Sequence, residues 1–211
     1  IAQNISDDND FSPGMETWLQ LRCETPILVQ QGDRFILRRA SPLTTLGGGE
    51  IFDPWAPRFR KKERSKRTLQ LEAISQGDQL VFLDRAGPAG LYLKEAHSRW
   101  GRPPPKSILL GDRILSPSQC NSLSDKVLAH LRESHLKNPL SLGTPKRSLQ
   151  SGVLMELGPA AFDALIARLD NEKRLVSSDG LARENDWKPY LTDAEENAAR
   201  QLLDLLDTSK W

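Results

Sequence analysis

GDRFILRRASPLTTLGGGEIFDP, residues 32–54, is the stretch from which the fold of the first part of this chain can be worked out. Residues 34–39 alternate basic with aromatic or aliphatic side chains, which is the period-two pattern of a strand with one dry face. Ser41-Pro42 ends that strand, and three consecutive glycines precede a second short strand at residues 50–52. A glycine run in such a place predicts a bulge, a sharp barrel corner or the close approach of another backbone.

The rest of residues 1–55 also has the pattern of β structure. Residues 18–23 alternate in polarity, residues 27–29 are short and apolar, and a turn at residues 31–33 leads into the strand at Phe35. Four or five short strands with no helix between them predict part of a small antiparallel barrel. We assign this region to residues 1–56.

The sequence changes character at residues 54–67, PWAPRFRKKERSKR, which carry seven basic residues against one acidic residue. The prolines mark a boundary, and we assign residues 57–67 to a basic linker or the start of a helix. Trp55 and Phe59 could stack on bases or pack on the barrel, and we expect packing. A solvated connector and a contact to RNA phosphates both fit the charge run, because Lys and Arg gain affinity for nucleic acid by releasing counterions. The candidate phosphate contacts here are Arg58, Arg60, Lys61, Lys62 and Arg64.

Residues 68–120 have the pattern of helices with little strand. Apolar spacing predicts helices around residues 69–83 and over 91–100, a short helix over 106–110 after three prolines, and a strand at 112–116. This order resembles a small winged-helix module.

Residues 121–188 give a clearer winged helix-turn-helix. An amphipathic helix is predicted over 121–137, and a second over 145–150 with Thr144 as its N-cap. A third helix follows over 159–173, then a hairpin of residues 174–177 and 181–184 across Ser178-Asp179-Gly180. Residues 189–211 then open a further helix, with a capping box from Thr192 to Glu195.

Three stretches of this sequence resemble one known family. They are R-F-I-L-R followed by T-x-G-G-G at residues 34–49, HLKNPLSLGTPKRSL at 135–149, and WKPYLTDAEENAARQLLDLL at 187–206. Together they resemble the selenocysteine-specific elongation factors of the EF-Tu class, the SelB family. One residue departs from the family pattern: Thr44-Thr45 stands where the family usually has Arg-Thr.

The resemblance implies a multidomain α+β fold, with a partial antiparallel β-barrel like the third domain of EF-Tu followed by tandem winged-helix modules. The modules would cover residues 68–120, 121–188 and, as one helix of a third, 189–211. The chain opens on Ile1, so we interpret it as a fragment whose GTPase domain, with its GTP and Mg²⁺, lies outside it. We expect no cofactor within the fragment.

The resemblance also implies what the intact factor does. Such factors carry selenocysteinyl-tRNA to the ribosome at UGA codons that are accompanied by an mRNA hairpin, the SECIS element, which is bound by a module outside this fragment. The tRNA-facing residues would be Thr45, Gly47, Gly48 and Gly49, and Lys146 and Arg147 would contact phosphate in the second winged helix. A cytoplasmic monomer is expected.

The composition argues against several other classes. A net charge of +1 argues against a uniformly basic nucleic-acid binder. No apolar run approaches the ~20 residues of a membrane span. Cys23 and Cys120 are expected to be unpaired, buried thiols. The three histidines lack metal-ligand spacing, and no phosphate-binding loop or catalytic pair is present, so we expect no catalytic residue and no metal site.

Two alternatives remain open from the residues themselves. One is a transcription regulator with tandem winged helices on duplex DNA, although the helix over 159–173 is lined outward by acidic residues rather than basic ones. The other is an interaction arm that binds only protein surfaces.

Overall fold

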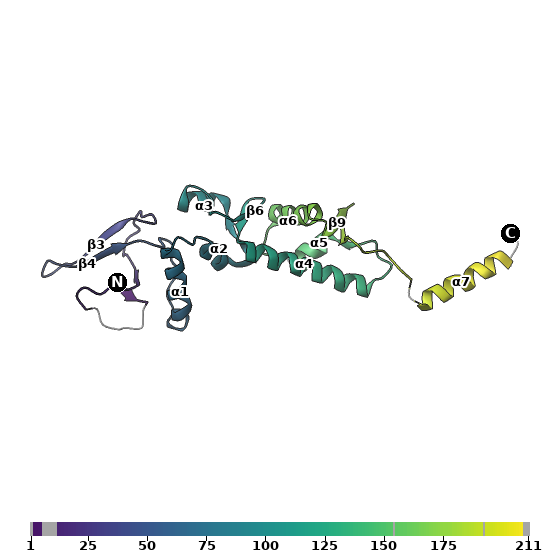
Figure 1. The fold of residues 1–211 in the computed structure, drawn as a ribbon, viewed down its shortest axis with the longest axis horizontal. Coiled ribbons are helices and arrows are strands. Elements are labelled where there is room, and N and C mark those ends of the chain that lie inside the picture. Colours follow the sequence, from purple (N-terminus) through teal and green to yellow (C-terminus); the bar gives the residue numbers. More distant parts are fainter. Residues whose placement is uncertain (1, 6–11, 154, 192, 209–211) are drawn as a thin grey trace. The chain divides into compact units, whose positions relative to one another are not determined.

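The structure is a computed structural model that describes residues 2–5, 12–153, 155–191 and 193–208. The chain divides into two compact units, residues 1–85 with 92–107 and residues 86–91 with 108–211, which we call unit 1 and unit 2. Figure 1 shows their helices and strands. The sheets are small and antiparallel, and none of those described closes into a barrel. The predicted α+β class with an incomplete barrel is confirmed.

Unit 1 begins with two separate two-stranded sheets. Strands β1 (Ala2–Asn4) and β2 (Leu19–Leu21) pair antiparallel, and β3 (Arg34–Arg39) pairs with β4 (Thr44–Glu50). Within the second pair, Leu37 lies opposite Gly47 and Arg38 lies opposite Thr45, so the intervening Leu46 has no partner across the ladder. A bulge, one of the three outcomes predicted for this stretch, therefore lies beside the first glycine.

Three helices complete the described part of unit 1. After a short 3₁₀ turn, η1 (Lys61–Glu63), helix α1 spans Arg64–Ser75, α2 spans Leu80–Ala86 and α3 spans Leu93–Trp100. Helix α3 ends at Gly101, whose left-handed backbone lets its N–H donate to the carbonyl of His97. The predicted helices at 69–83 and 91–100 are confirmed.

The apolar core at the start of unit 1 is small. Ile5, Phe59 and Leu71 are buried together, and Trp18 packs against them. The Trp18 ring also meets Phe52 edge-on, with ring centroids 5.2 Å apart. Phe59 thus packs as predicted, whereas Trp55 is exposed, so the prediction that it packs on the barrel is wrong.

Unit 2 contains a complete winged helix. Its elements are α4 (Pro117–Lys137), β8 (Thr144–Pro145), α5 (Lys146–Val153), α6 (Pro159–Asn171), β9 (Leu175–Ser178) and β10 (Leu181–Glu184). The three strands form one sheet in the order β8-β10-β9. The predicted helices and hairpin of this module are confirmed. Helix α4 begins earlier than expected because Ser116 caps it by accepting from the N–H of Gln119.

A second hairpin shares the core of this winged helix. Strands β6 (Ile108–Leu110) and β7 (Arg113–Leu115) pair antiparallel, and β7 lies between β6 and β5 (Leu91–Tyr92). Leu110 and Leu115 belong to the same buried cluster as residues of α4 and α6. At the turn, a Cβ on Gly111 would lie 2.7 Å from the carbonyl oxygen of Ala160. Only glycine fits there.

Three other local predictions are wrong. Residues 108–110 form a strand rather than a helix, because the Gly111-Asp112 turn pairs them with β7. Thr144 is not a helix cap: it pairs with Ala182 in the sheet, and the N–H of Lys146 donates to the carbonyl of Gly180. Cys23 is exposed, while Cys120 is buried as expected.

The last helix, α7 (Asp193–Thr208), carries exposed leucines. Leu202, Leu203, Leu205 and Leu206 are each more than half exposed. The predicted capping box rests on Thr192, which lies outside the described residues. The module divisions at residues 56, 67, 120 and 188 stay predictions.

Candidate nucleic-acid interface

The glycine run lies on β4, opposite the first half of β3. Phe35 pairs with Gly49 and Ile36 with Gly48. A Cβ on Gly48 would lie 2.7 Å from the Phe35 carbonyl oxygen, and a Cβ on Gly49 would lie 2.9 Å from Cζ of the Phe35 ring. Gly48 is therefore required by the partner backbone, a Cβ on Gly49 would displace the Phe35 ring, and a Cβ on Gly47 would meet nothing within 4 Å.

Two arginines lie across the ladder from the threonines that precede the glycines. Arg38 pairs with Thr45 and Arg39 with Thr44, and all four residues are exposed. The end of the hairpin therefore presents two hydroxyls beside two guanidinium groups, which are both suited to phosphate oxygens. These arginines were not among the residues predicted to bind, although they stand within the strand pattern of residues 34–39.

The start of the basic segment is anchored around Phe59. The ring of Phe59 is buried in the cluster with Ile5 and Leu71. The side-chain amide of Gln20 donates to the carbonyl of Pro57 at 2.9 Å and accepts from the N–H of Phe59 at 2.7 Å. Because both sides of this short stretch are anchored, Arg58 and Arg60 are held at the surface on either side of a buried ring.

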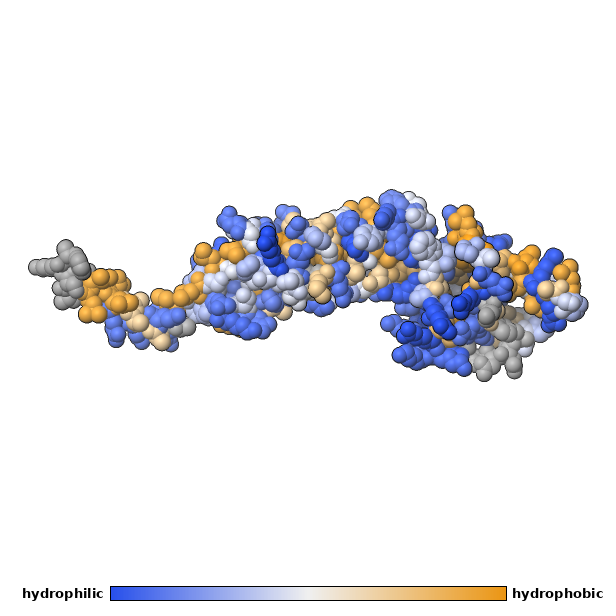
Figure 2. All heavy atoms as spheres, turned by 180° about the vertical axis from the view of Figure 1, so that it is seen from behind, coloured by the Kyte–Doolittle hydropathy of each residue, from blue (hydrophilic) through white to orange (hydrophobic). Residues whose placement is uncertain are grey.

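The cations around this anchor are open to solvent. Arg58, Arg60, Lys61 and Lys62 are exposed, and no ion pair joins any of the four to a carboxylate of the described residues. Figure 2 shows hydrophilic residues gathered over the α1 region of unit 1. Surface cations of this kind release counterions when they contact phosphates.

The basic residues within α1 are less exposed than those that precede it. Arg64 is half-buried and Arg67 is buried, with its guanidinium 3.9 Å from Asp53. Burial, and then the charge of Arg85, lower the pKa of Arg67 from its ordinary value, while Asp53 opposes that shift. Arg67 is thus a structural cation rather than a free one.

Asp53 is the centre of a buried ionic cluster in unit 1. Its side chain is 2% exposed and lies 2.7 Å from Arg85 of α2 and 4.0 Å from Arg99 of α3. Its Oδ1 also closes the turn after β4 by accepting from the N–H of Trp55. One carboxylate therefore joins α1, α2 and α3, and nothing in the sequence spacing of the arginines indicated this.

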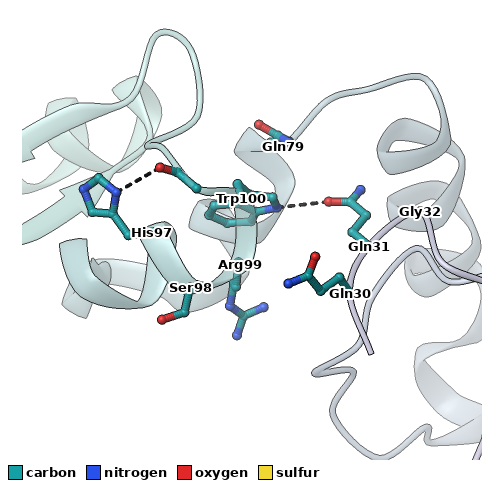
Figure 3. A pocket seen from close by; sticks show the side chains of 9 residues that line it. Gln30, Gln31, Gly32, Gln79, His97, Ser98, Arg99 and Trp100 are labelled. Carbon is teal, nitrogen blue, oxygen red and sulfur yellow. Dashed lines mark hydrogen bonds between the residues drawn. The ribbon is translucent and has the colours of Figure 1, made fainter. Parts of the chain in front are cut away.

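Unit 1 also contains an open groove of about 590 Å³ beside this cluster. Figure 3 shows Gln30 and Gln31, from the loop before β3, extending toward Arg99 and Trp100 at the end of α3. The indole N–H of Trp100 donates to the Gln31 side chain at 3.0 Å. We call this the glutamine groove; its lining is Gln30, Gln31, Gly32, Gln79, His97, Ser98, Arg99, Trp100 and Gly101.

In unit 2, Lys146 and Arg147 open helix α5. Lys146 is half-buried and Arg147 is exposed. They belong to unit 2, whereas the predicted residues at 45–64 belong to unit 1.

Helix α6, which would be the reading helix of a DNA-binding winged helix, offers few free cations. Its Arg168 lies 2.8 Å from Glu172, and Asp163 and Asn171 are exposed. A helix that reads the major groove needs basic and amide side chains directed at bases and phosphates. The DNA-regulator alternative is therefore not favoured.

Neither a metal site nor a membrane span is found in the described part of the chain. It holds no group of three or more His, Cys, Asp or Glu side chains placed to bind a metal ion. Among its helices, none has both the length and the apolar composition that crossing a membrane requires.

Comparison with known proteins gives two family matches. Residues 11–58 match the β-barrel domain of the selenocysteine-specific elongation factor, and residues 128–183 match the winged helix of elongation factor SelB. The selenocysteine-specific elongation factor of Desulfomicrobium baculatum is 26% identical over 181 residues, which cover 77% of this chain and 28% of that protein.

A solved structure agrees with these matches in fold. The crystal structure of a bacterial selenocysteine-specific elongation factor, EF-Sec, superposes with a TM-score of 0.50 at 21% identity, covering 88% of this chain and 30% of that one. The chain thus spans less than a third of either relative. A β-barrel match is thus followed along the chain by a winged-helix match, and both are to domains of selenocysteine-specific elongation factors.

Proposed function

We propose that this chain is the portion of a selenocysteine-specific elongation factor that joins its tRNA-facing barrel to its winged-helix arm. The intact factor would deliver selenocysteinyl-tRNA to the ribosome at UGA codons, using GTP and Mg²⁺ in its GTPase domain and an mRNA hairpin bound elsewhere in the arm. It would act in the cytoplasm as a monomer.

One observation carries the proposal: a family barrel region and a family winged helix occur in order, with an anchored basic segment between them. Four exposed cations on a fixed backbone support an RNA contact better than a flexible connector would, because less conformational entropy is lost on binding. Thr45, Arg38 and Arg39 on the hairpin form a second proposed contact.

We further propose that the winged helix of unit 2 is a spacer. The surface of α6 carries the exposed Asp163, and its Arg168 is already paired with Glu172. Lys146 and Arg147 then remain a minor proposed contact.

The test is a salt-dependent titration of this chain with selenocysteine tRNA. Removing one phosphate contact should reduce the slope of log affinity against log salt by about 1. We expect a variant with Arg58, Arg60, Lys61 and Lys62 changed to alanine to bind roughly a hundredfold more weakly at low salt and to show a slope flatter by about 3 to 4.

A matched variant controls for total charge. Lys94, Lys126, Lys137 and Lys188 are also exposed, and changing them to alanine removes the same four charges elsewhere. Equal weakening in the two variants, or tight and sequence-selective binding to duplex DNA instead of tRNA, would contradict the proposal.

A further inference from the structure

The glutamine groove has unused hydrogen-bonding capacity. Within the described part of the chain, no hydrogen bond occupies the side-chain amides of Gln30 or Gln79, and Gln31 uses its oxygen alone. An amide group both donates and accepts, so these side chains can match the mixed donor and acceptor edge of a nucleobase.

The groove also has a fixed aromatic ring and a fixed charge. Trp100 is half-buried, oriented by its bond to Gln31 and packed against Phe82 with ring centroids 5.3 Å apart, and the rest of its indole lines the groove. Arg99 is held 2.7 Å from Glu95 and packs over Trp55 at 4.9 Å from the ring centroid. Sites for single-stranded nucleic acid combine such rings with a positive wall.

The charge of the surroundings favours a polyanion. None of the nine lining residues is acidic. The buried cluster behind Arg99 holds Arg67, Arg85 and Arg99 against Asp53 and Glu95, a surplus of one positive charge. An acidic peptide would satisfy the charge but would leave the stacking surface and the amide pairs without matched partners.

We infer that the glutamine groove binds an unpaired nucleotide of RNA, with the base on Trp100 and its edge on the glutamine amides. The choice of RNA rests on the proposed function. The volume of the groove, about 590 Å³, lies within the range usual for small-ligand sites.

The experiment uses the whole chain and follows the indole N–H resonance of Trp100 by NMR, assigned with a Trp100→Phe variant. The probes are single-stranded octamers of uridine and of adenosine, an abasic octamer of the same charge, and an acidic octapeptide. We expect the base-bearing octamers to shift this resonance and the abasic octamer to leave it in place. A shift with one of the two base-bearing octamers would identify the preferred base and support the inference.

A paired set of variants tests the amides. Gln30→Ala with Gln79→Ala should weaken octamer binding roughly tenfold, since two hydrogen bonds are removed. Gln3→Ala with Gln76→Ala, two exposed glutamines outside the groove, should leave it unchanged. An unmoved Trp100 resonance, equal binding by both double variants, or a shift with the acidic peptide alone would overturn the inference.

These outcomes are separable from those of the proposed function. If the octamers leave the Trp100 resonance unmoved while the chain still binds selenocysteine tRNA, only the inference about the groove fails. If the octamers shift the Trp100 resonance but the chain does not bind selenocysteine tRNA, the proposed function fails and the inference about the groove stands.

Discussion

Unit 1 and unit 2 are stabilised by different kinds of interaction. Unit 2 has a large cluster of buried apolar residues contributed by β6, β7, α4, α5, α6 and the wing. Unit 1 has a small apolar cluster around Phe59 and a buried carboxylate, Asp53, that lies among arginines of α1, α2 and α3. The apolar core draws on many side chains, whereas the ionic cluster depends on one residue.

This difference agrees with the proposed function, in which unit 1 contacts RNA and the winged helix of unit 2 is a spacer. The exposed cations, the hairpin and the glutamine groove all belong to unit 1, and Arg99 of its ionic cluster lines the groove. The winged helix of unit 2 has a continuous apolar core, and Arg168 on its α6 is paired with Glu172. Four perturbations can distinguish the two units experimentally.

Truncating the core of unit 2 should have the greatest consequence. Leu165→Ala removes a fully buried side chain. The change should lower the free energy of unfolding by about 2 to 5 kcal/mol. Leu203, on α7, is exposed. Leu203→Ala should therefore change that free energy by less than about 0.5 kcal/mol. Urea denaturation followed by circular dichroism measures both, and similar values would contradict the assignment of the core.

The next largest effect should come from removing the negative charge of Asp53 in the ionic cluster of unit 1. Asp53→Asn leaves Arg67, Arg85 and Arg99 without their shared carboxylate. It should cost about 3 kcal/mol, because breaking a buried pair leaves uncompensated charge. Hydrogen exchange should show faster opening of α1 and α3, while α4 and α6 keep their protection. Glu72→Gln, at an exposed position of α1, is the control, and an equal effect of the two variants would refute the role of Asp53.

A smaller difference separates two neighbouring glycines. Gly48→Ala places a Cβ against the Phe35 carbonyl oxygen. It should destabilise the hairpin by about 1 to 3 kcal/mol. Gly47→Ala meets no atom within 4 Å and should be tolerated. Amide hydrogen exchange in β3 measures the effect of each variant. Equal protection in the two variants would contradict the close approach of Gly48 to the Phe35 carbonyl.

The least of the four effects depends on pH. His135 is buried and stacked on Trp187 with ring centroids 4.1 Å apart, and neither of its ring nitrogens has a partner in the described chain. Burial lowers the pKa of His135, while Glu184 opposes the shift. The unfolded chain then binds the proton more readily, so stability should fall as pH drops below the ordinary histidine pKa of about 6.5. The fall cannot exceed about 1.4 kcal/mol for each pH unit.

His135→Phe keeps a ring on Trp187 and removes the titrating group. The unfolding free energy of this variant, measured by urea denaturation, should lose the pH dependence between roughly pH 8 and pH 5.5. An unchanged slope in the variant would assign the pH dependence to other groups.

The sequence predicted elements well where the signal was local. The hairpin across Ser178-Asp179-Gly180 and the amphipathic stripe of α4 are local patterns, and both are confirmed. The helix predicted over 106–110 was wrong because the apolar run Ile108-Leu109-Leu110 suits a strand once Gly111 turns the chain back.

The candidate site was less predictable. The basic run was visible in the sequence, but the anchoring of Phe59 by Gln20 joins residues 39 positions apart. Asp53 and its arginines, and the glutamines of the groove, are likewise brought together only by the fold. Long-range contacts of this kind have no periodicity for a sequence pattern to reveal.

If unit 1 contacts RNA while the winged helix of unit 2 serves as a spacer, the two units must respond differently to tRNA. Hydrogen exchange of this chain, with and without selenocysteine tRNA, compares them in one experiment. We predict added protection in residues 34–50 and 57–67 and none in 159–171. Protection concentrated in α6, with residues 57–67 unchanged, would show instead that the winged helix makes the RNA contact.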